Sequence, residues 1–314
     1  MKASVVIPAY NASKTLGVVL DALTKQDEPE FEVIIINDAS TDDTSKVAES
    51  FSDKLDLHVY SPPENLGRAR ARNYGVEKSS AEVVLLLDSD IEAVPSYVSA
   101  HLALHKVESR AVGVGVLRYP PHLAKRALAR YYSSRGGARV KPDEPLPGKA
   151  FVSCLASFRR SLFEEVGGFH PGFRIYGGED LELGLKFQKS GAVLKYLRDA
   201  IGYHHHLRLL KEVMITLEKY GREGVPLVLE LHPDFAAEMR LDDLTTGANT
   251  IRAFFRRLAI KPVFNRPLLE IASLLQYRRL PSTLLTYLHY CAYRRGFGSY
   301  LHSSRQTASA QRNP

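Results

Sequence analysis

The sequence predicts an α/β fold with a mostly parallel sheet flanked by helices, followed by a mostly helical C-terminal region. Two observations favour this fold. Up to residue 90, short apolar runs alternate with helical stretches through short connections, as is typical of doubly wound parallel sheets. From Leu207 onward, the spacing of apolar residues favours helices punctuated by prolines. We therefore divide the chain into a sheet domain (1–210), a basic helical region (211–305) and a disordered tail (306–314).

The predicted elements follow one another in a regular order. Strands are predicted at residues 3–8, 31–36, 57–60 and 83–87, and helices at 13–26, near 47–51 and at 67–78. Further strands are predicted at 111–117 and 151–157. Residues 118–149 are rich in Arg, Gly and Pro and are predicted to form a long loop with one short helix, a length typical of functional or mobile loops.

The stretch 83–90 carries the first functional signal. Its five apolar residues suit a strand buried on both faces, and Asp88 and Asp90 follow directly. In an extended segment, residues i and i+2 point the same way, so we expect both carboxylates to face the crevice where open α/β sheets bind ligands. Carboxylate oxygens suit Mg²⁺ or Mn²⁺, which often share their coordination with phosphates. Aspartates at a strand end also commonly begin a turn, so the surrounding residues decide.

Composition describes an ordinary globular protein, with 45% apolar and 25% charged residues. Cys154 and Cys291 lie far apart without metal or redox spacing, which is consistent with a reducing compartment. The N-terminal apolar run is too short for a signal peptide, and no run approaches the ~18 apolar residues of a membrane span. We expect a cytoplasmic protein, either free or peripheral on the inner face of the plasma membrane.

The net charge of +7 is concentrated near the C-terminus. Residues 251–305 hold ten Lys or Arg and one acid, interleaved with Phe, Leu and Tyr, as at 254–257, 276–279 and 293–297. This pattern suits an amphipathic helix on an anionic bilayer, while helices packed on the sheet domain with solvated arginines explain it equally well. We find no recognised nucleic-acid-binding module and expect no nucleic-acid partner.

Polar residues also follow the first two predicted strands. Pro8-Ala9-Tyr10-Asn11 ends the first strand and Asp38 ends the second, at the same rim as Asp88 and Asp90. Residues 40–43 read as a helix N-cap with acids in the first turn. That interpretation leaves Asp38 unexplained, and its carboxylate could accept a hydrogen bond from a nucleobase or ribose.

Three further clusters have both functional and structural interpretations. Arg68 and Arg72 share a helix face near the helix N-terminus, which suits a diphosphate or a solvated basic surface. Glu179 and Asp180 follow Gly177-Gly178 and provide either a general base or ordinary first-turn acids. His204 and His206 lie on one side of a predicted strand end, where an imidazole could complete a metal site or serve structure.

Taken together, residues 1–210 resemble the inverting, non-processive family 2 glycosyltransferases with the GT-A fold. The motifs that carry the resemblance, in the order of the family, are Val6–Asn11, Asn37–Asp42, Asn65-x-Gly67 with Ala71-Arg72-Asn73, Asp88-x-Asp90, Val166–Phe169 and Glu179-Asp180. The resemblance implies a GT-A domain that binds a UDP-, GDP- or dTDP-sugar donor with a divalent cation, Mg²⁺ or Mn²⁺, and inverts the anomeric carbon.

The resemblance also implies roles for individual residues. The predicted nucleotide-binding set is Pro8, Ala9, Tyr10, Asn11, Asp38, Arg68, Arg72, Asp88 and Ser89. Asp90 would be the direct metal ligand, with His204 as the imidazole ligand and His206 as the close alternative. Asp180 would be the general base, and Glu179 would help to position the acceptor or the base.

Two departures from the family pattern bear on specificity. Asn37 precedes Asp38 and Ala39 replaces a glycine, which leaves the donor base open. The chain has no Trp, and therefore no Gln-x-x-Arg-Trp motif of processive synthases, so we expect transfer of a single sugar to a glycan or lipid-linked hydroxyl.

The alternative functions are a sugar nucleotidyltransferase and a membrane-surface binding protein with a degenerate GT-A domain. The nucleotidyltransferase would need a glycine-rich loop after the first strand, where residues 9–13 contain no glycine. The binding protein would act through the basic C-terminal region.

Overall fold

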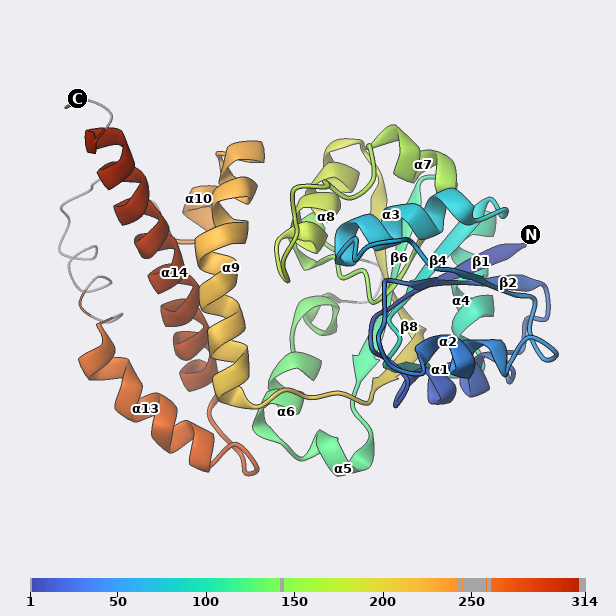
Figure 1. The fold of residues 1–314 in the computed structure, drawn as a ribbon, viewed down its shortest axis with the longest axis horizontal. Coiled ribbons are helices and arrows are strands. Elements are labelled where there is room, and N and C mark those ends of the chain that lie inside the picture. The colour runs from blue at the N-terminus through green and yellow to red at the C-terminus, as the bar shows by residue number, and fades with distance from the viewer. Residues whose placement is uncertain (1, 142–143, 242–243, 245–257, 259–260, 311–314) are drawn as a thin grey trace. The chain divides into compact units, whose positions relative to one another are not determined.

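The computed structural model describes residues 2–141, 144–241, 244, 258 and 261–310. The chain divides into two compact units, which are described separately (Figure 1). The first unit consists of Met1–Ala124, Tyr132–Arg174 and Glu179–Leu207. The second consists of Lys125–Tyr131, Ile175–Gly178 and Arg208–Pro314. The segments 245–257 and 311–314, which include the predicted basic stretch 254–257, lie outside the described residues.

The first unit is built on an eight-stranded sheet with the order β3-β2-β1-β4-β7-β6-β8-β5. Its parallel part joins β3 (Leu57–Tyr60), β2 (Phe31–Asn37), β1 (Ala3–Ala9) and β4 (Val83–Leu87). The sheet continues through β7 (Leu155–Arg159), β6 (Ala111–Arg118), β8 (Val193–His204) and β5 (Ile91–Ala93). Here β7 runs antiparallel to both β4 and β6, and β5 runs antiparallel to β8. The predicted sheet is confirmed as an α/β sheet of mixed direction.

Helices cover both faces of this sheet (Figure 1). One face carries α1 (Leu16–Leu23), α2 (Thr44–Glu49) and α4 (Tyr97–Val107), and the other carries α3 (Arg68–Lys78), α7 (Arg160–Glu165) and α8 (Glu179–Lys189). Successive residues of β1 serve opposite faces, because side chains alternate along a strand. Val5 packs in the core below α1 and α4, whereas Val6 lies against Gly75 of α3.

The prediction is less accurate beyond residue 90. Strand β5 and helix α4 were not predicted, and the strand predicted at 151–157 begins at Leu155. The predicted loop with one short helix contains two α-helices, α5 (Pro121–Ala124) and α6 (Ala127–Ser133), and two 3₁₀ turns, Gly136–Arg139 and Gly148–Ala150. The single predicted helix was therefore wrong.

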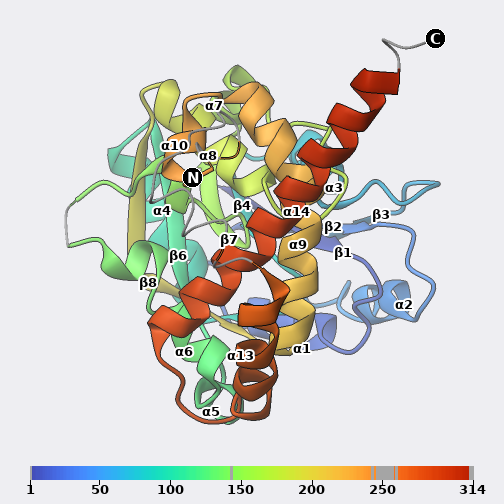
Figure 2. The ribbon, with the colours of Figure 1, turned by 90° about the vertical axis from the view of Figure 1, so that its left-hand side faces the viewer.

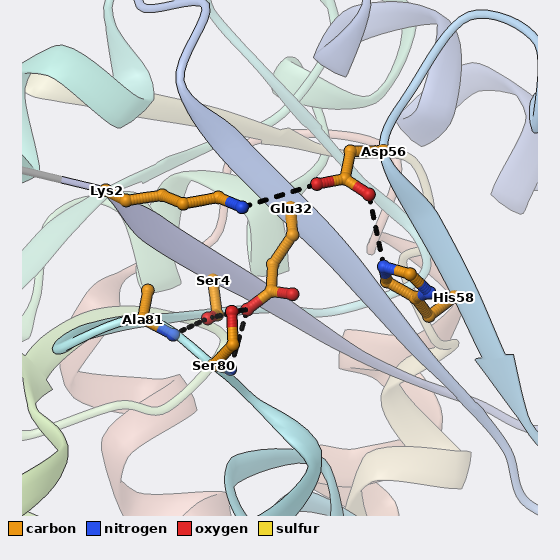
Figure 3. A network of polar contacts seen from close by, with 7 residues as sticks. All are labelled: Lys2, Ser4, Glu32, Asp56, His58, Ser80 and Ala81. Carbon is orange, nitrogen blue, oxygen red and sulfur yellow. Dashed lines mark hydrogen bonds and ion pairs between the residues drawn. The ribbon is translucent and has the colours of Figure 1, made fainter.

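Hydrogen bonds connect the amino-terminal ends of the central strands, at the end of the sheet opposite to their carboxyl ends (Figure 3). Glu32 of β2 accepts hydrogen bonds from the Ser4 hydroxyl and from the backbone and hydroxyl of Ser80. The Ser4 hydroxyl in turn accepts from the backbone of Ala81, just before β4. Burial would raise the pKa of Glu32, but these hydrogen bonds outweigh burial and lower it. The network therefore stabilises the end of the sheet that carries no predicted site residue.

The second unit is helical in its described part. Its main helices are α9 (Leu210–Leu231), α10 (Phe235–Glu238), α13 (Pro262–Leu274) and α14 (Ser282–Ala310) (Figure 2). Helices α9 and α14 pack closely, since a Cβ on Gly221 would overlap the Tyr293 carbonyl and one on Gly296 would overlap that of Glu218. Helix α14 extends through Ala310, whereas the sequence predicts disorder from residue 306.

Both interpretations of the basic C-terminal stretch leave the arginines at 294 and 295 unpaired at the surface, and this is wrong for these two residues. Arg294 is fully buried and donates to the carbonyl of Arg240, while Arg295 pairs with Glu218 at 3.1 Å and donates to Asn265. Both guanidinium groups serve the interior of the second unit. Among the helices that the structure describes, none has the length and apolar character required to cross a bilayer.

Candidate active site

The residues after β4 form a turn, which corrects the prediction of an extended segment. Residues 88–90 leave the strand, and the carbonyl of Asp88 accepts from the backbone of Ile91 at 3.1 Å. The carboxylates of Asp88 and Asp90 consequently have different partners. Ser89 lies half-buried at the tip of this turn, and its nucleotide-binding role stays a prediction.

Asp88 pairs with Arg72. The Arg72 Nη2 atom lies 2.6 Å from Asp88 Oδ1, and the arginine side chain is 2% exposed on the first turns of α3. Burial alone would lower the pKa of Arg72, but the charges of Asp88, Asp180 and Glu179 outweigh it and raise that pKa. Arg72 is therefore a fixed cation among three carboxylates, two of which come from a helix about a hundred residues later in the chain.

Asp90 meets the predicted imidazoles at the end of β8. The Asp90 Oδ2 atom lies 3.0 Å from His204 Nε2 and 3.9 Å from His206 Nδ1. Burial favours a higher pKa for Asp90, but the hydrogen bond from His204 and the charges of His204, His206 and Arg68 lower it. The carboxylate is thus held ionised beside two imidazole rings, and carboxylate oxygens are the ligands that Mn²⁺ and Mg²⁺ prefer. His204 is the closer of the two imidazoles, and His206 is exposed.

Asp38 binds the backbone that begins α3. Its two carboxylate oxygens accept from the amides of Leu66 at 2.6 Å and Gly67 at 3.0 Å, and its carbonyl accepts from Asn65 at 2.9 Å. The residue is 4% exposed. Asp38 therefore positions the loop in front of Arg68 and Arg72, and direct contact with a nucleotide stays a prediction.

The loops after β1 and β2 hold each other. Asn11 Oδ1 accepts from the backbone of Thr41 at 2.8 Å, and the Asn11 amide donates to the Ser40 hydroxyl at 3.0 Å. The carbonyl of Ala9 accepts from the amide of Asp38 at 2.8 Å. Tyr10 is left 56% exposed beside Pro8, which is half-buried. A fixed loop with a free aromatic ring could stack a base, because every base offers a π-face.

Ala39 adopts a left-handed backbone with φ of +58°. This conformation is strained for a residue with a Cβ and is readily adopted by glycine. The alanine that replaces a glycine of the family pattern at this position therefore adds backbone strain. The Asp38 carboxylate still accepts hydrogen bonds from the amides of Leu66 and Gly67.

Two motifs meet around Asn73. Its side chain accepts from the amide of Phe169 at 2.9 Å and donates to the carbonyl of the same residue at 2.8 Å. The Arg72 guanidinium lies 5.8 Å from the centre of the Phe169 ring. Gly167-Gly168-Phe169 is therefore a loop that α3 anchors, on the side of the helix next to Arg72.

The predicted base lies in a buried carboxylate pair at the start of α8. Asp180 Oδ2 accepts from the amide of Ser153 at 3.1 Å, while its Oδ1 atom is buried and has no hydrogen-bond partner among the described residues. Burial raises the pKa of Glu179, and the Asp180 charge adds to this effect. Burial likewise raises the pKa of Asp180, against the opposing effects of Arg72 and Ser153. An ionised carboxylate with a raised pKa is a stronger base, and the Oδ1 atom of Asp180 is available to accept a proton.

The segment Ser153-Cys154 positions Asp180 and Asp88, and this role was not predicted from the sequence. The Ser153 amide binds Asp180, and the Cys154 carbonyl accepts from the Asp88 amide at 3.2 Å. Burial, followed by the charges of Asp88 and Asp180, raises the pKa of the Cys154 thiol. No local signal marks these residues, because they reach the site through the antiparallel pairing of β7 with β4, in which Leu155 lies opposite Leu87.

The structure thus brings together Arg72, Asp88, Asp90, Asp180 and His204 around the carboxyl end of β4. Arg68 is exposed, and its charge acts on Asp90 and Glu179. Within the described residues, no three His, Cys, Asp or Glu side chains come close enough to hold a metal ion by themselves.

The sequence profile of glycosyl transferase family 2 matches residues 4–167, more than half of the chain. A second profile, described as the N-terminal domain of galactosyltransferase, matches residues 137–209. The chain therefore belongs to glycosyl transferase family 2. The matched region contains all but the first residue of β1, and all of β4 and the turn with Asp88 and Asp90.

Two relatives illustrate the range of the family. The chain is 31% identical over 234 residues to the O-antigen chain rhamnosyltransferase RfbN of Salmonella typhimurium, covering 72% of each chain. It is 30% identical over 263 residues to a validoxylamine A glucosyltransferase of Streptomyces hygroscopicus subsp. limoneus, covering 73% of this chain and 58% of the relative. The chain thus spans little more than half the length of that glucosyltransferase.

Solved structures share the fold at lower identity. Residues 1–349 of Staphylococcus aureus TarS, in complex with UDP-GlcNAc, match with a TM-score of 0.56 and 19% identity, covering 98% of this chain and 92% of that one. The mannosyltransferase PcManGT of Pyrobaculum calidifontis, in complex with GDP-Man and Mn²⁺, matches with a TM-score of 0.54 and 18% identity, covering 93% and 86%. These likenesses confirm the GT-A fold.

Proposed function

We propose that this protein is a metal-dependent, inverting glycosyltransferase that moves one sugar from a nucleotide-diphosphate donor to a hydroxyl group. The observation that carries the proposal is the meeting of Asp90 with His204 at 3.0 Å, beside the Arg72–Asp88 pair. Nucleotide sugars in the related structures, UDP-GlcNAc in TarS and GDP-Man with Mn²⁺ in PcManGT, support the donor class and the cation.

In this proposal, Asp90 and His204 would hold the cation through a carboxylate oxygen and an imidazole nitrogen. A divalent cation there would neutralise charge on the departing diphosphate. Arg68 and Arg72 add positive charge at the head of α3, where backbone amides also favour an anion. The Asp38 carboxylate fixes this helix start through Leu66 and Gly67, so the phosphate-binding groups are preorganised.

Asp180 is the proposed general base. Its buried Oδ1 atom has no hydrogen-bond partner among the described residues, and burial raises its proton affinity. Proton transfer from the acceptor hydroxyl to Oδ1 would accompany attack on the anomeric carbon, on the side opposite to the diphosphate. Glu179 lies next to Asp180 and raises the local negative charge. Positioning of the two substrates and electrostatic stabilisation of the transition state would accelerate the transfer, and no covalent intermediate would form.

The acceptor that we propose is a glycan or a lipid-linked hydroxyl, met at an anionic membrane surface. Single transfer is supported by the lack of the Gln-x-x-Arg-Trp motif. Asp180→Asn tests the base, since transfer from a radiolabelled donor should be almost abolished while donor affinity stays unchanged. Glu182→Gln on the same helix is the matched control and should retain transfer. Normal transfer by Asp180→Asn would show that the base assignment is wrong.

A further inference from the structure

Helix α13 of the second unit has its apolar face in solvent. Leu274 is 81% exposed, Val263 70% and Ile271 55%. Val263 lies about two helical turns before Ile271, and Leu274 lies about one turn after it, so the three side chains share one side of the helix. Leu268 and Leu275 widen the same face and are each 39% exposed. A surface helix normally turns such a stripe inward, so this arrangement marks an interaction site.

The inner face of α13 is fixed by polar and small residues. Asn265 is 2% exposed and accepts from Arg295 at 2.8 Å, and Ala272 is fully buried. Lys211 of α9 pairs with Glu270 at 2.6 Å. These contacts fix the orientation of α13 within its unit. The apolar side chains point outward because polar and small residues occupy the buried side of the helix.

Cations flank this face. The stretch 261–279 contains one acid, Glu270, against four basic residues: Lys261, Arg266, Arg278 and Arg279. All four are exposed, and none forms an ion pair with another described residue. Tyr277, 56% exposed, lies beside the last two arginines. An apolar stripe bordered by such arginines and a tyrosine is the composition of a helix that lies in a lipid interface.

We propose that residues 261–279 bind the surface of a bilayer rich in anionic phospholipids, with α13 parallel to the membrane plane. The apolar side chains would enter the acyl boundary, and Arg266, Arg278 and Arg279 would contact the phosphate headgroups. Pairing of two copies through this face would bring their cations together, which disfavours self-association as the occupant. The biological role of this surface rests on the proposed function, because binding to a bilayer would bring a membrane-bound acceptor near the enzyme.

The test is co-sedimentation of the full chain with vesicles of phosphatidylcholine alone or mixed with phosphatidylglycerol. We expect binding to the anionic vesicles that falls as salt is raised. The double variant Ile271→Glu with Leu274→Glu should bind at least about tenfold more weakly. Arg278→Gln with Arg279→Gln should weaken binding by about 30-fold, because each arginine near an anionic surface contributes about fivefold. Val107→Glu is the matched control, since Val107 is 84% exposed in the first unit, and should bind as the native chain does.

The four residues substituted in the two double variants are exposed, as is Val107 in the control. Circular dichroism and thermal unfolding should therefore be unchanged in every variant, which verifies folding. Failure of the native chain to bind anionic vesicles would overturn the proposal, as would equal binding by the Ile271 and Leu274 variant. The proposal would also be overturned if the native chain dimerises without binding vesicles and the Ile271 and Leu274 variant does not dimerise. The occupant of this face would then be a second copy of the chain. Because the assay contains no donor or acceptor, its result is independent of whether the proposed transfer occurs.

Discussion

The guanidinium of Arg72 lies 2.6 Å from the carboxylate of Asp88, with the arginine almost fully buried between α3 and the end of β4. Removal of one partner of a buried ion pair leaves the other charge uncompensated. We expect Arg72→Met to lower the free energy of unfolding by about 3 kcal/mol. Urea unfolding measures this loss. Arg70→Met, at an exposed position of the same helix, should change stability by less than about 0.5 kcal/mol, and equal losses would contradict the assignment.

Ala39 offers a test of backbone strain beside the site. Its φ of +58° costs about 1 kcal/mol for alanine, so Ala39→Gly should raise the free energy of unfolding by about that amount. Ala100→Gly within helix α4 should have the opposite sign, because glycine is about 1 kcal/mol less favourable than alanine in a helix interior. Thermal unfolding would reveal both changes. Destabilisation by Ala39→Gly would show that this conformation is unstrained.

Two glycines on α14 give a matched pair for the second unit. A methyl group at Gly296 would overlap the Glu218 carbonyl of α9, whereas a methyl group at Gly298 would meet no described atom within 4 Å. Gly296→Ala should therefore destabilise by about 1–3 kcal/mol. Gly298→Ala should stabilise by up to about 1 kcal/mol through helix propensity. Similar effects of the two substitutions on urea unfolding would contradict the close packing of α9 and α14.

Two buried histidines make folding sensitive to acid. His101 Nδ1 and His105 Nε2 lie 2.7 and 2.8 Å from the hydroxyl of Ser157, and burial lowers the pKa of His101 to about 3 and that of His105 to about 4. Below the unfolded pKa of about 6.5, the unfolded chain binds protons that the folded chain excludes, so stability falls as the pH is lowered. Between pH 7 and pH 5 we expect each imidazole to contribute a loss of about 2 kcal/mol.

The measurement is urea unfolding at several pH values. His105→Gln should reduce the slope of stability against pH in this range, because it removes one imidazole whose pKa burial lowers. A slope that His105→Gln does not alter would show that the buried histidine is not responsible.

The parallel half of the sheet was predictable from sequence because its strands follow one another through short connections, and β1, β2 and β4 are almost entirely buried on both faces. Strands β3 and β4 have the predicted bounds, Leu57–Tyr60 and Val83–Leu87. Strand β5 has three residues and pairs with β8 more than a hundred residues later, so no local pattern reveals it.

The same distinction applies to the candidate site. The proximity of Asp90 and His204 could be predicted because carboxylates and imidazoles at strand ends are informative by residue type, while their role as metal ligands stays a prediction. The partners of Asp38 are backbone amides, and Ser153 acts through its amide, so neither interaction leaves a side-chain signature. The arginines at 294 and 295 were misassigned because periodicity alone does not show which basic side chains have buried acceptors.

The most direct test of the central claim is nucleotide binding by Asp90→Ala, measured by calorimetry with UDP, GDP and dTDP in the presence of Mn²⁺ and then of EDTA. The matched control is Glu92→Ala, since Glu92 forms a neighbouring carboxylate–imidazole pair with His205 at 2.6 Å and has no proposed role. We predict that the native chain and Glu92→Ala bind one nucleotide in a metal-dependent manner, and that Asp90→Ala loses the metal-dependent part. Binding by Asp90→Ala that equals the native affinity, or native binding that EDTA leaves unchanged, would contradict the account.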